Sequence, residues 1–192
     1  MELTITVWHA FRSKSRASRA GRSTARRWAF KEQGKFSMEE YRFREARLDD
    51  LAALVEMLAD DELGQTRELP GTPLKDGYMA AFESIQNDPN NELIVCESDG
   101  QLLGMLQISF IPYLTYLGSW RALIEGVRVV SSHRGEGIGA KLFGWAIQRA
   151  REKGCLIVQL TSDKKRPDAI RFYKKLGFRA SHEGMKLWLR ES

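Results

Sequence analysis

The sequence predicts one domain of the α/β (α+β) class, with a mixed central sheet of about six or seven strands flanked by about four helices. The first observation is that strand-length apolar segments and amphipathic helical segments follow one another between residues 41 and 190, in the order βααβββαβαββ. The second is the composition: 192 residues with 43% hydrophobic and 29% charged residues are typical of a globular domain and exclude collagen-like, disulfide-scaffold and wholly disordered chains. The third is that no apolar run reaches the roughly 18 residues of a membrane-spanning helix.

The first half of this order is a strand, two helices and a hairpin. Residues 41–47 alternate apolar and charged side chains, which predicts a strand. Asp49 or Asp50 is expected to cap a helix that ends near Gly64, because apolar residues recur there at helical spacing. The patterns that follow predict a loop over 64–77, a helix over 78–86, a strand over 92–97, a hairpin turn at Asp99-Gly100 and its partner strand over 101–111.

The second half contains an aromatic loop over residues 112–120, two helices and four strands. The longer helix is expected over Ile138–Lys153, because basic residues near its C-terminus favour the helix dipole and Gly154 can supply a left-handed cap. Pro167 suits the first turn of the second helix, which runs to Leu176. The four strands are predicted over residues 123–130, 155–161, 178–182 and 185–190, the last two as a terminal hairpin.

The positive charge is concentrated at the N-terminus. The whole chain carries a formal charge of +5, whereas residues 1–37 hold nine Lys and Arg against two Glu and so carry +7, which leaves −2 for the other 155 residues. This Arg-, Ser- and Ala-rich extension is expected to be disordered. A phosphate- or headgroup-binding arm, an organellar transit peptide and a start codon assigned too early all fit it, and the last is favoured. We therefore divide the chain into an extension, 1–37, and a domain, 38–192.

Compartment and partners follow from the cysteines and from the charge of the domain. Cys96 and Cys155 each lie in an apolar, strand-like run, and no secretory signal is recognisable, so reduced thiols and a cytoplasmic location are expected. Nucleic acid is not expected as a partner, because the domain is slightly acidic and has no basic-aromatic platform. The sequence leaves the oligomeric state open between a monomer and a homodimer.

A glycine cluster marks the start of the longer helix, where residues 134–139 read Arg-Gly-Glu-Gly-Ile-Gly. Free backbone N–H groups at a helix N-terminus favour anions, and glycines let several of them converge on a phosphate without a side chain in the way. The cluster therefore predicts a pyrophosphate site. A nucleoside-triphosphate P-loop is excluded because no Gly-Lys-Ser/Thr follows. A Rossmann dinucleotide site is disfavoured by the Gly-x-Gly-x-Gly spacing, although Asp163 stands near the place of its ribose-binding acid.

Two segments resemble the GNAT superfamily of N-acetyltransferases, which bind acetyl-CoA. Residues 134–139 match its Gln/Arg-x-x-Gly-x-Gly/Ala signature. Residues 169–178, Ala-Ile-Arg-Phe-Tyr-Lys-Lys-Leu-Gly-Phe, resemble its Ala-x-x-Phe-Tyr-x-x-Leu-Gly-Phe segment. Together with the element order, the resemblance spans roughly residues 41–190. It implies the GNAT fold and acetyl-CoA-dependent acetylation of an amine.

The resemblance also implies roles for single residues. The strand before the glycine cluster would supply backbone N–H groups to pantetheine and to the thioester carbonyl, and Tyr173 would protonate the departing thiolate. Many members carry Asn where this chain has Arg166, so either Asp163 takes over the contact with pantetheine or Arg166 reaches the phosphates of CoA. The residues expected to bind acetyl-CoA are Val127, Arg128, Val129, Arg134, Gly135, Glu136, Gly137, Ile138, Gly139, Ala140, Asp163, Arg166 and Tyr173.

Glu125 is the candidate general base. It is a carboxylate in an otherwise apolar strand, where burial would raise its pKa toward a useful value, and its likeness to GNAT members with Glu-Gly at this place suggests that it faces the acceptor amine. A solvent-facing Glu125 is the alternative, as core packing is for Tyr173. The loops over 64–77 and 112–120 are expected to shape the acceptor site.

The predicted reaction is transfer of an acetyl group from acetyl-CoA to a primary amine of a small molecule, by direct attack on the thioester. Two alternatives stay open. One is acetylation of a protein or peptide. The other is a non-catalytic acyl-CoA or dinucleotide-binding module, which would need the glycine cluster but neither Glu125 nor Tyr173. No metal site is predicted.

Overall fold

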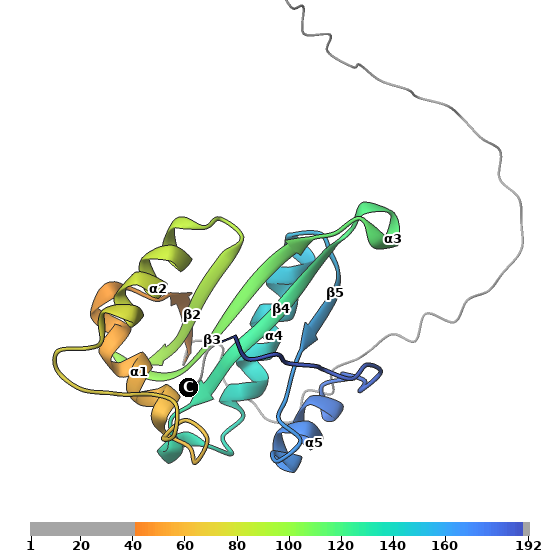
Figure 1. The fold of residues 1–192 in the computed structure, drawn as a ribbon. Coiled ribbons are helices and arrows are strands. Elements are labelled where there is room, and N and C mark those ends of the chain that lie inside the picture. Colours follow the sequence, from red (N-terminus) through yellow and green to blue (C-terminus); the bar gives the residue numbers. More distant parts are fainter. Residues whose placement is uncertain (1–40, 190–192) are drawn as a thin grey trace, which may run out of the picture. The chain divides into compact units, whose positions relative to one another are not determined.

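The computed structural model describes residues 41–189 (Figure 1). The predicted extension, residues 1–37, lies outside the described residues, and so does the end of the predicted last strand. Within the described chain, five strands form one sheet in the order β1-β2-β3-β4-β5. The first four strands pair antiparallel and β5 runs parallel to β4, so the predicted mixed sheet is confirmed.

The elements follow the predicted order as far as α5, except that the short helix α3 lies inside the segment predicted as an aromatic loop. Two short 3-10 turns, Leu48–Asp50 and Ser131–His133, precede α1 and α4. The helices and strands are β1 (Arg42–Glu45), α1 (Leu51–Ala59), α2 (Asp76–Asn87), β2 (Asn91–Ser98), β3 (Gln101–Pro112), α3 (Thr115–Gly118), β4 (Trp120–Val129), α4 (Ile138–Glu152), β5 (Cys155–Leu160) and α5 (Pro167–Lys175).

The hairpin between β2 and β3 turns where the sequence predicts it. Asp99 and Gly100 both have positive φ, 49° and 77°. A two-residue hairpin needs this left-handed backbone at both positions, and an Asp-Gly pair adopts it at little cost. The turn aligns β2 and β3 along almost their full length, which creates the centre of the sheet.

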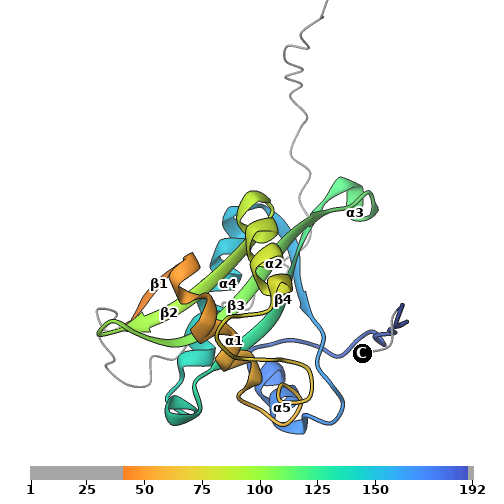
Figure 2. The ribbon, with the colours of Figure 1, turned by 60° about the vertical axis from the view of Figure 1, so that its left-hand side comes forward.

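The sheet carries a hydrophobic core on each face, covered by different helices (Figures 1 and 2). On one face lie α4 and the aromatic side chains of α5, and on the other face lie α1 and α2. The fully buried side chains of the first core include Ile94, Cys96, Leu106, Ile108, Phe110, Ala122, Ile124, Leu142, Phe143 and Ala146. Those of the second core include Leu54, Val55, Phe82, Val95 and Met105.

Helix α1 ends earlier than predicted, at Ala59 rather than near Gly64. After Ala59 the chain turns, and the Asp61 carboxylate accepts a hydrogen bond from the Gly64 N–H at 2.6 Å. Gly64 passes so close to the α1 backbone that a Cβ there would lie 2.0 Å from the Leu58 carbonyl oxygen. The tight turn therefore requires glycine, and it holds Asp60 and Asp61 beside the end of β4.

The predicted terminal hairpin is wrong for the described structure. Phe178–His182 and Met185–Leu189 form no strand, and the described sheet has five strands instead of six or seven. Apolar alternation shows only that a segment could pair, whereas a strand also needs an available edge and a face to bury. Here Phe178 packs on aromatic rings of α4 and α5, and Met185, Leu187 and Leu189 are 85–94% exposed.

The described residues contain neither a helix long and apolar enough to cross a membrane nor a group of three or more potential metal-ligating His, Cys, Asp or Glu side chains. Both cysteines are free thiols, Cys96 buried and Cys155 half-buried. Burial raises the pKa of the Cys96 thiol to about 11, which keeps it protonated and unreactive at neutral pH.

Candidate active site

Strands β4 and β5 stop pairing halfway along β4. The last paired residues are Ile124 and Leu160, although β4 continues to Val129. Beyond Ile124, the edge of β4 that faces β5 has no paired strand among the described residues. Backbone groups on such an edge are available to another hydrogen-bonding partner.

A bulge at Gly126 sets which way the side chains of this open segment point. Arg128 pairs with Met105 and Glu125 with Gln107, so β4 has one more residue than β3 between these pairs. Gly126 has φ of 61°, a left-handed backbone that suits glycine. Because of the extra residue, Val127 and Val129 pack on the same core as Ile124, and Glu125 and Arg128 lie on the opposite, α1-facing side.

The backbone of Val127 and Val129 faces the open edge. The Val130 N–H donates to Leu103 of β3, and alternate residues of an antiparallel ladder point in opposite directions, so Val129 faces away from β3. The Val127 carbonyl accepts a bond from the Arg128 guanidinium and the Val129 carbonyl one from Arg134, at 2.9 and 3.1 Å. By the same alternation the Arg128 N–H faces β3. Two of the three predicted backbone donors therefore face the open edge, and Arg128 does not.

The glycine cluster forms the entrance to α4. Gly135 and Gly137 have φ of 94° and 86°, and Gly137 is the N-cap of the helix in the left-handed conformation. A Cβ at either position would meet nothing within 4 Å, so both glycines border open space. Glu136 is exposed beside them, whereas Ile138 is buried in the core and anchors the helix.

The first turn of α4 also packs against α5. A Cβ on Gly139 would lie 3.4 Å from the Phe172 ring, so glycine at this position permits a close approach of the two helices. Gly139 and Ala140 are half-buried, and the N–H groups of a first helical turn have no partner within the helix. The segment combines converging N–H groups with the positive end of the helix dipole, which is the chemistry that binds phosphate.

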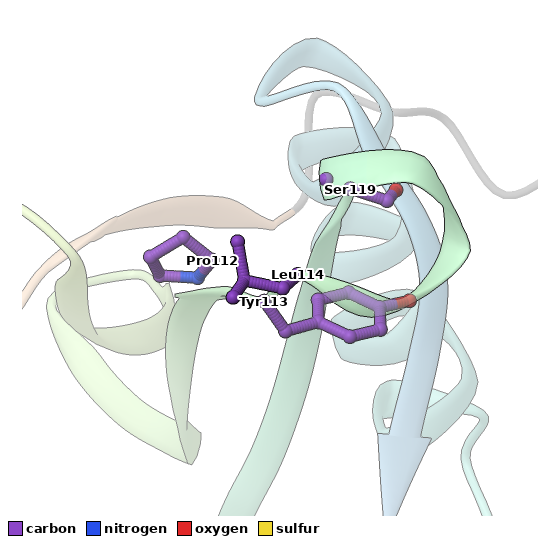
Figure 3. Close-up of a pocket in the computed structure, with 5 residues that line it drawn as sticks. Pro112, Tyr113, Leu114 and Ser119 are labelled. Carbon is purple, nitrogen blue, oxygen red and sulfur yellow. The ribbon is translucent and has the colours of Figure 1, made fainter.

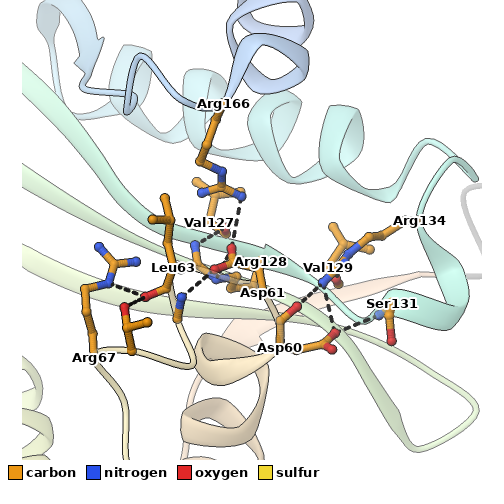
Figure 4. Close-up of polar contacts among 12 residues, drawn as sticks. Asp60, Asp61, Leu63, Arg67, Val127, Arg128, Val129, Ser131, Arg134 and Arg166 are labelled. Atoms are coloured by element: carbon orange, nitrogen blue, oxygen red, sulfur yellow. Dashed lines mark hydrogen bonds and ion pairs between the residues drawn. The ribbon is translucent and has the colours of Figure 1, made fainter.

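Arg134 reaches the end of α1 and stays 48% exposed. Its guanidinium donates to the Asp60 carboxylate at 2.9 Å and to the Asp60 carbonyl at 2.7 Å, and the same carboxylate accepts the Ser131 N–H at 3.1 Å (Figure 4). These bonds join the loop before the glycine cluster to the end of α1. The Arg134 side chain therefore positions the cluster, and its guanidinium is engaged with Asp60.

Asp61 is the centre of a second set of contacts (Figure 4). Its Oδ2 lies 3.1 Å from the Arg166 guanidinium and 3.6 Å from Nε of Arg128. Burial acts to raise the pKa of Asp61, but the Gly64 N–H and the positive charges of Arg128, Arg166 and Arg67 outweigh it, so the pKa is lowered and Asp61 is ionised at neutral pH.

Asp60 and Asp61 were not predicted from the sequence. One signal for them exists: two acids directly after a helix oppose the negative end of its dipole, which indicates that something else stabilises them. Their partners Arg128, Arg134 and Arg166 come from distant parts of the chain, and helical or strand periodicity carries no information about such pairs.

Tyr173 packs among aromatic rings on the α4 side of the sheet. Its ring centroid lies 5.4 Å from that of Phe143, 5.5 Å from Phe172 and 6.3 Å from Phe178. Burial raises the pKa of the phenol, and the positive charges of Arg166 and Arg128 partly oppose this rise. The packing alternative is therefore correct for the ring, while the hydroxyl lies within electrostatic reach of the arginines on the far side of the open edge.

The turn before α5 involves Asp163 in local contacts. The Asp163 carboxylate accepts the Lys165 N–H at 2.8 Å, and its carbonyl accepts the Arg166 N–H at 3.0 Å. The Arg166 side chain reaches across to Asp61. Glu125 also differs from expectation, since its side chain is exposed and the burial predicted for it is not found.

A shallow depression of about 250 Å3 lies at the tip of the β3–β4 hairpin, lined by Pro112, Tyr113, Leu114, Gly118 and Ser119 (Figure 3). This tip adjoins the start of β4, and the open edge begins after Ile124, so about 17 Å of strand separates them. None of the residues that line the depression belongs to the open edge, and the expectation that the aromatic loop over residues 112–120 shapes the acceptor site stays a prediction.

The family model and the curated relatives place the chain among acetyltransferases. Residues 51–178 match the family model of the acetyltransferase (GNAT) family. The chain is 31% identical over 115 residues to aminoalkylphosphonate N-acetyltransferase of Salmonella typhimurium, covering 60% of this chain and 71% of the relative. It is 38% identical over 140 residues to glucosamine 6-phosphate N-acetyltransferase of Trypanosoma brucei brucei, covering 72% and 88%.

A solved structure is more similar still. A transcriptional regulator from Bacillus halodurans C-125 superposes with a TM-score of 0.76 at 56% sequence identity, over 78% of this chain and 99% of that one. The fold, the glycine-led entrance to α4 and the family match agree, and the two relatives from Salmonella typhimurium and Trypanosoma brucei brucei are named as N-acetyltransferases. The chain belongs to the GNAT family of acetyltransferases.

Proposed function

We propose that this protein transfers the acetyl group of acetyl-CoA to a primary amine of a small molecule. The observation that carries the proposal is the open edge of β4, whose Val127 and Val129 backbone groups lead into the glycine cluster. Both N-acetyltransferase relatives named above act on small amines, which supports a small acceptor. The two free thiols are compatible with a reducing compartment and support a cytoplasmic location.

The glycine cluster fits the pyrophosphate of CoA. Gly135 and Gly137 border space that a side chain would fill, at the N-terminus of a 15-residue helix. The extended pantetheine arm would pair with the backbone of Val127 and Val129 in the manner of an added strand. A pantetheine arm on this edge would bring the thioester toward Tyr173, on which Arg166 and Arg128 act electrostatically.

Replacing Gly137 with Ala tests the phosphate site. Alanine in the left-handed conformation costs about 1 kcal/mol of stability, and its methyl group would enter the space assigned to phosphate, so acetyl-CoA affinity should fall about 10-fold. Isothermal titration calorimetry measures the affinity. Gly154→Ala is the matched control, because Gly154 has a similar φ of 73° and equally open surroundings at the other end of α4. Equal affinities of the two variants would contradict the assignment.

The chemistry requires an acid and a base. The amine nitrogen attacks the thioester carbonyl, the new C–N bond forms, and the C–S bond breaks. The thiolate takes a proton from Tyr173, whose raised pKa keeps it protonated at neutral pH. The amine must lose protons, and we assign this to Glu125 acting through water, because its exposed carboxylate lies on the same side of β4 as Arg128.

The Glu125→Gln variant is expected to acetylate amines about 100-fold more slowly while binding acetyl-CoA with unchanged affinity, because the amide keeps the shape but cannot accept a proton. Stopped-flow or steady-state thiol release gives the rate. Glu45→Gln on β1, also an exposed carboxylate, is the control and should retain the wild-type rate. A wild-type rate for Glu125→Gln would show that another group or bulk water removes the proton.

Two assays separate this function from its alternatives. In thermal-shift titrations, acetyl-CoA should stabilise the protein, whereas NAD and ATP should not, and stronger stabilisation by NAD would contradict the acetyl-CoA site. In a free-thiol release assay, small amines should give turnover. Turnover with peptides alone would favour a protein acceptor. Binding of acetyl-CoA without turnover on either class would favour a non-catalytic module.

A further inference from the structure

Three arginines surround Asp61 on the α1-facing side of β4 (Figure 4). Arg128 comes from β4 and its side chain is only 10% exposed. Arg166 comes from the start of α5 and is 39% exposed, so a ligand in solution can reach it. Arg67 follows the Gly64 turn and donates to the Leu63 carbonyl at 2.9 Å. The three residues lie on three different segments, and the fold brings them to one place.

These arginines outnumber the carboxylates that face them. Asp61 contacts Arg128 and Arg166, and Glu68 acts on Arg128 from further away while it accepts a hydrogen bond from the Tyr78 hydroxyl. The neighbouring Asp60 is paired with Arg134. The cluster of Arg67, Arg128, Arg166, Asp61 and Glu68 therefore has one more positive charge than negative.

The excess positive charge destabilises the charged form of the buried Arg128 guanidinium. Among the described residues, Nε of Arg128 and Oδ2 of Asp61 are buried without a hydrogen bond, and the ion pair between them is long. Burial lowers the pKa of Arg128, and the positive charges of Arg166 and Arg67 lower it further, while Asp61 and Glu68 act in the opposite direction. A buried guanidinium that is repelled by two others is stabilised by an additional anion.

The cluster also lies beside the proposed reaction. Arg166 and Arg128 act electrostatically on Tyr173, the proposed acid, across the open edge of β4. The glycine cluster that fits the CoA pyrophosphate is a separate place, and the guanidinium nearest to it, that of Arg134, is engaged with Asp60. An anion bound by Arg128 and Arg166 would lie on the α1-facing side of the open edge, across β4 from the ring of Tyr173.

We infer that the acceptor amine carries a phosphonate or phosphate group and that Arg166 and Arg128 bind this group. The inference rests on the proposed function and names its substrate class. An oxyanion with several acceptor atoms satisfies two guanidinium groups at once. The two relatives named above are enzymes for an aminoalkylphosphonate and a sugar phosphate, which agrees with this class.

Three acceptors of similar size test the inference: 2-aminoethylphosphonate, β-alanine and propylamine. They differ mainly in carrying a phosphonate, a carboxylate or no anionic group. The wild-type protein should have a kcat/KM for 2-aminoethylphosphonate about 10- to 100-fold above that for propylamine, which is the effect of one or two charge-assisted hydrogen bonds. In Arg166→Gln this ratio should fall at least about 10-fold. In Arg171→Gln it should stay unchanged, because Arg171 is an exposed cation of the same helix that pairs with Asp168.

The possible results show whether Arg166 binds the anionic group of the acceptor amine or the phosphates of CoA. A KM for acetyl-CoA that rises in Arg166→Gln, with the selectivity ratio unchanged, would assign Arg166 to the CoA phosphates and overturn the inference. A higher kcat/KM for β-alanine than for 2-aminoethylphosphonate would overturn the phosphonate class. Calorimetric binding of 2-aminoethylphosphonate in the presence of CoA gives a readout without turnover. Binding that depends on Arg166 supports the site even if the proposed acetyl transfer fails, and no binding overturns the inference.

Discussion

Replacing Tyr173 with Phe is expected to slow acetyl transfer by about 100- to 10,000-fold, the range typical of a lost general acid. The ring contacts with Phe143, Phe172 and Phe178 remain in the variant, so its folding and its affinity for acetyl-CoA should change little. Only the proton for the departing thiolate is missing. Single-turnover measurements with saturating acetyl-CoA separate this chemical step from binding.

The pH profile gives a second readout for Tyr173. The acid works in its protonated form, and burial raises the pKa of the phenol above its ordinary value of 10.0. Tyr173 should therefore cause no loss of activity up to about pH 10, and a loss should begin only as the pH rises toward the raised pKa. Tyr113→Phe, which removes a buried hydroxyl at the distant hairpin tip, is the control. A wild-type rate and an unchanged profile in Tyr173→Phe would leave Tyr173 with packing alone.

The Arg149→Met variant is expected to lose about 3 kcal/mol of unfolding free energy at neutral pH, the largest stability effect that we predict. Glu92 is 7% exposed at the start of β2. Its carboxylate accepts bonds from Nε and Nη2 of Arg149 at 3.0 and 2.7 Å, and Lys153 lies 3.8 Å away. Without Arg149, a buried carboxylate keeps only the distant Lys153. Urea unfolding with an unchanged m-value gives the free energy.

A double variant shows whether the buried charge causes this loss. Glu92→Leu alone should cost less than Arg149→Met, because Arg149 is 32% exposed and can be hydrated once its partner is gone. In the double variant Glu92→Leu/Arg149→Met, the buried charge itself is removed, and the remaining partners Lys153 and Glu152 are 33% and 52% exposed, so most of the loss caused by Arg149→Met should be recovered. Additive losses would mean that packing, and not the buried charge, explains the effect.

Local patterns account for the parts of the fold that could be predicted. Asp99-Gly100 needs only its own backbone to form the hairpin turn, and Gly154 has the left-handed conformation predicted for the C-cap of α4. The helical spacing of Ile138, Leu142 and Ala146 likewise brings these side chains into the core. In each case the physical cause lies within a few residues of the pattern.

The features that were missed depend on distant contacts. Asp61 forms ion pairs with Arg128 and Arg166, which lie 67 and 105 residues further along the sequence. No local sequence pattern predicts such a cluster. Glu125 stands in an apolar strand, but a strand has two faces, so the sequence could not decide between a buried Glu125 and the solvent-facing alternative that the structure shows. The alternation of Met185, Leu187 and Leu189 indicates strand propensity without indicating a partner.

Mass spectrometry of both products tests most directly whether this chain moves an acetyl group from acetyl-CoA to a small amine. The purified protein is incubated with acetyl-CoA labelled in the acetyl group and with 2-aminoethylphosphonate, with Tyr173→Phe in parallel. We predict that the label appears on the amine nitrogen in an amount equal to the CoA thiol released, and that Tyr173→Phe forms at least about 100-fold less product. Release of CoA thiol with the label recovered as free acetate, or label on no amine of a broader panel, would contradict the account.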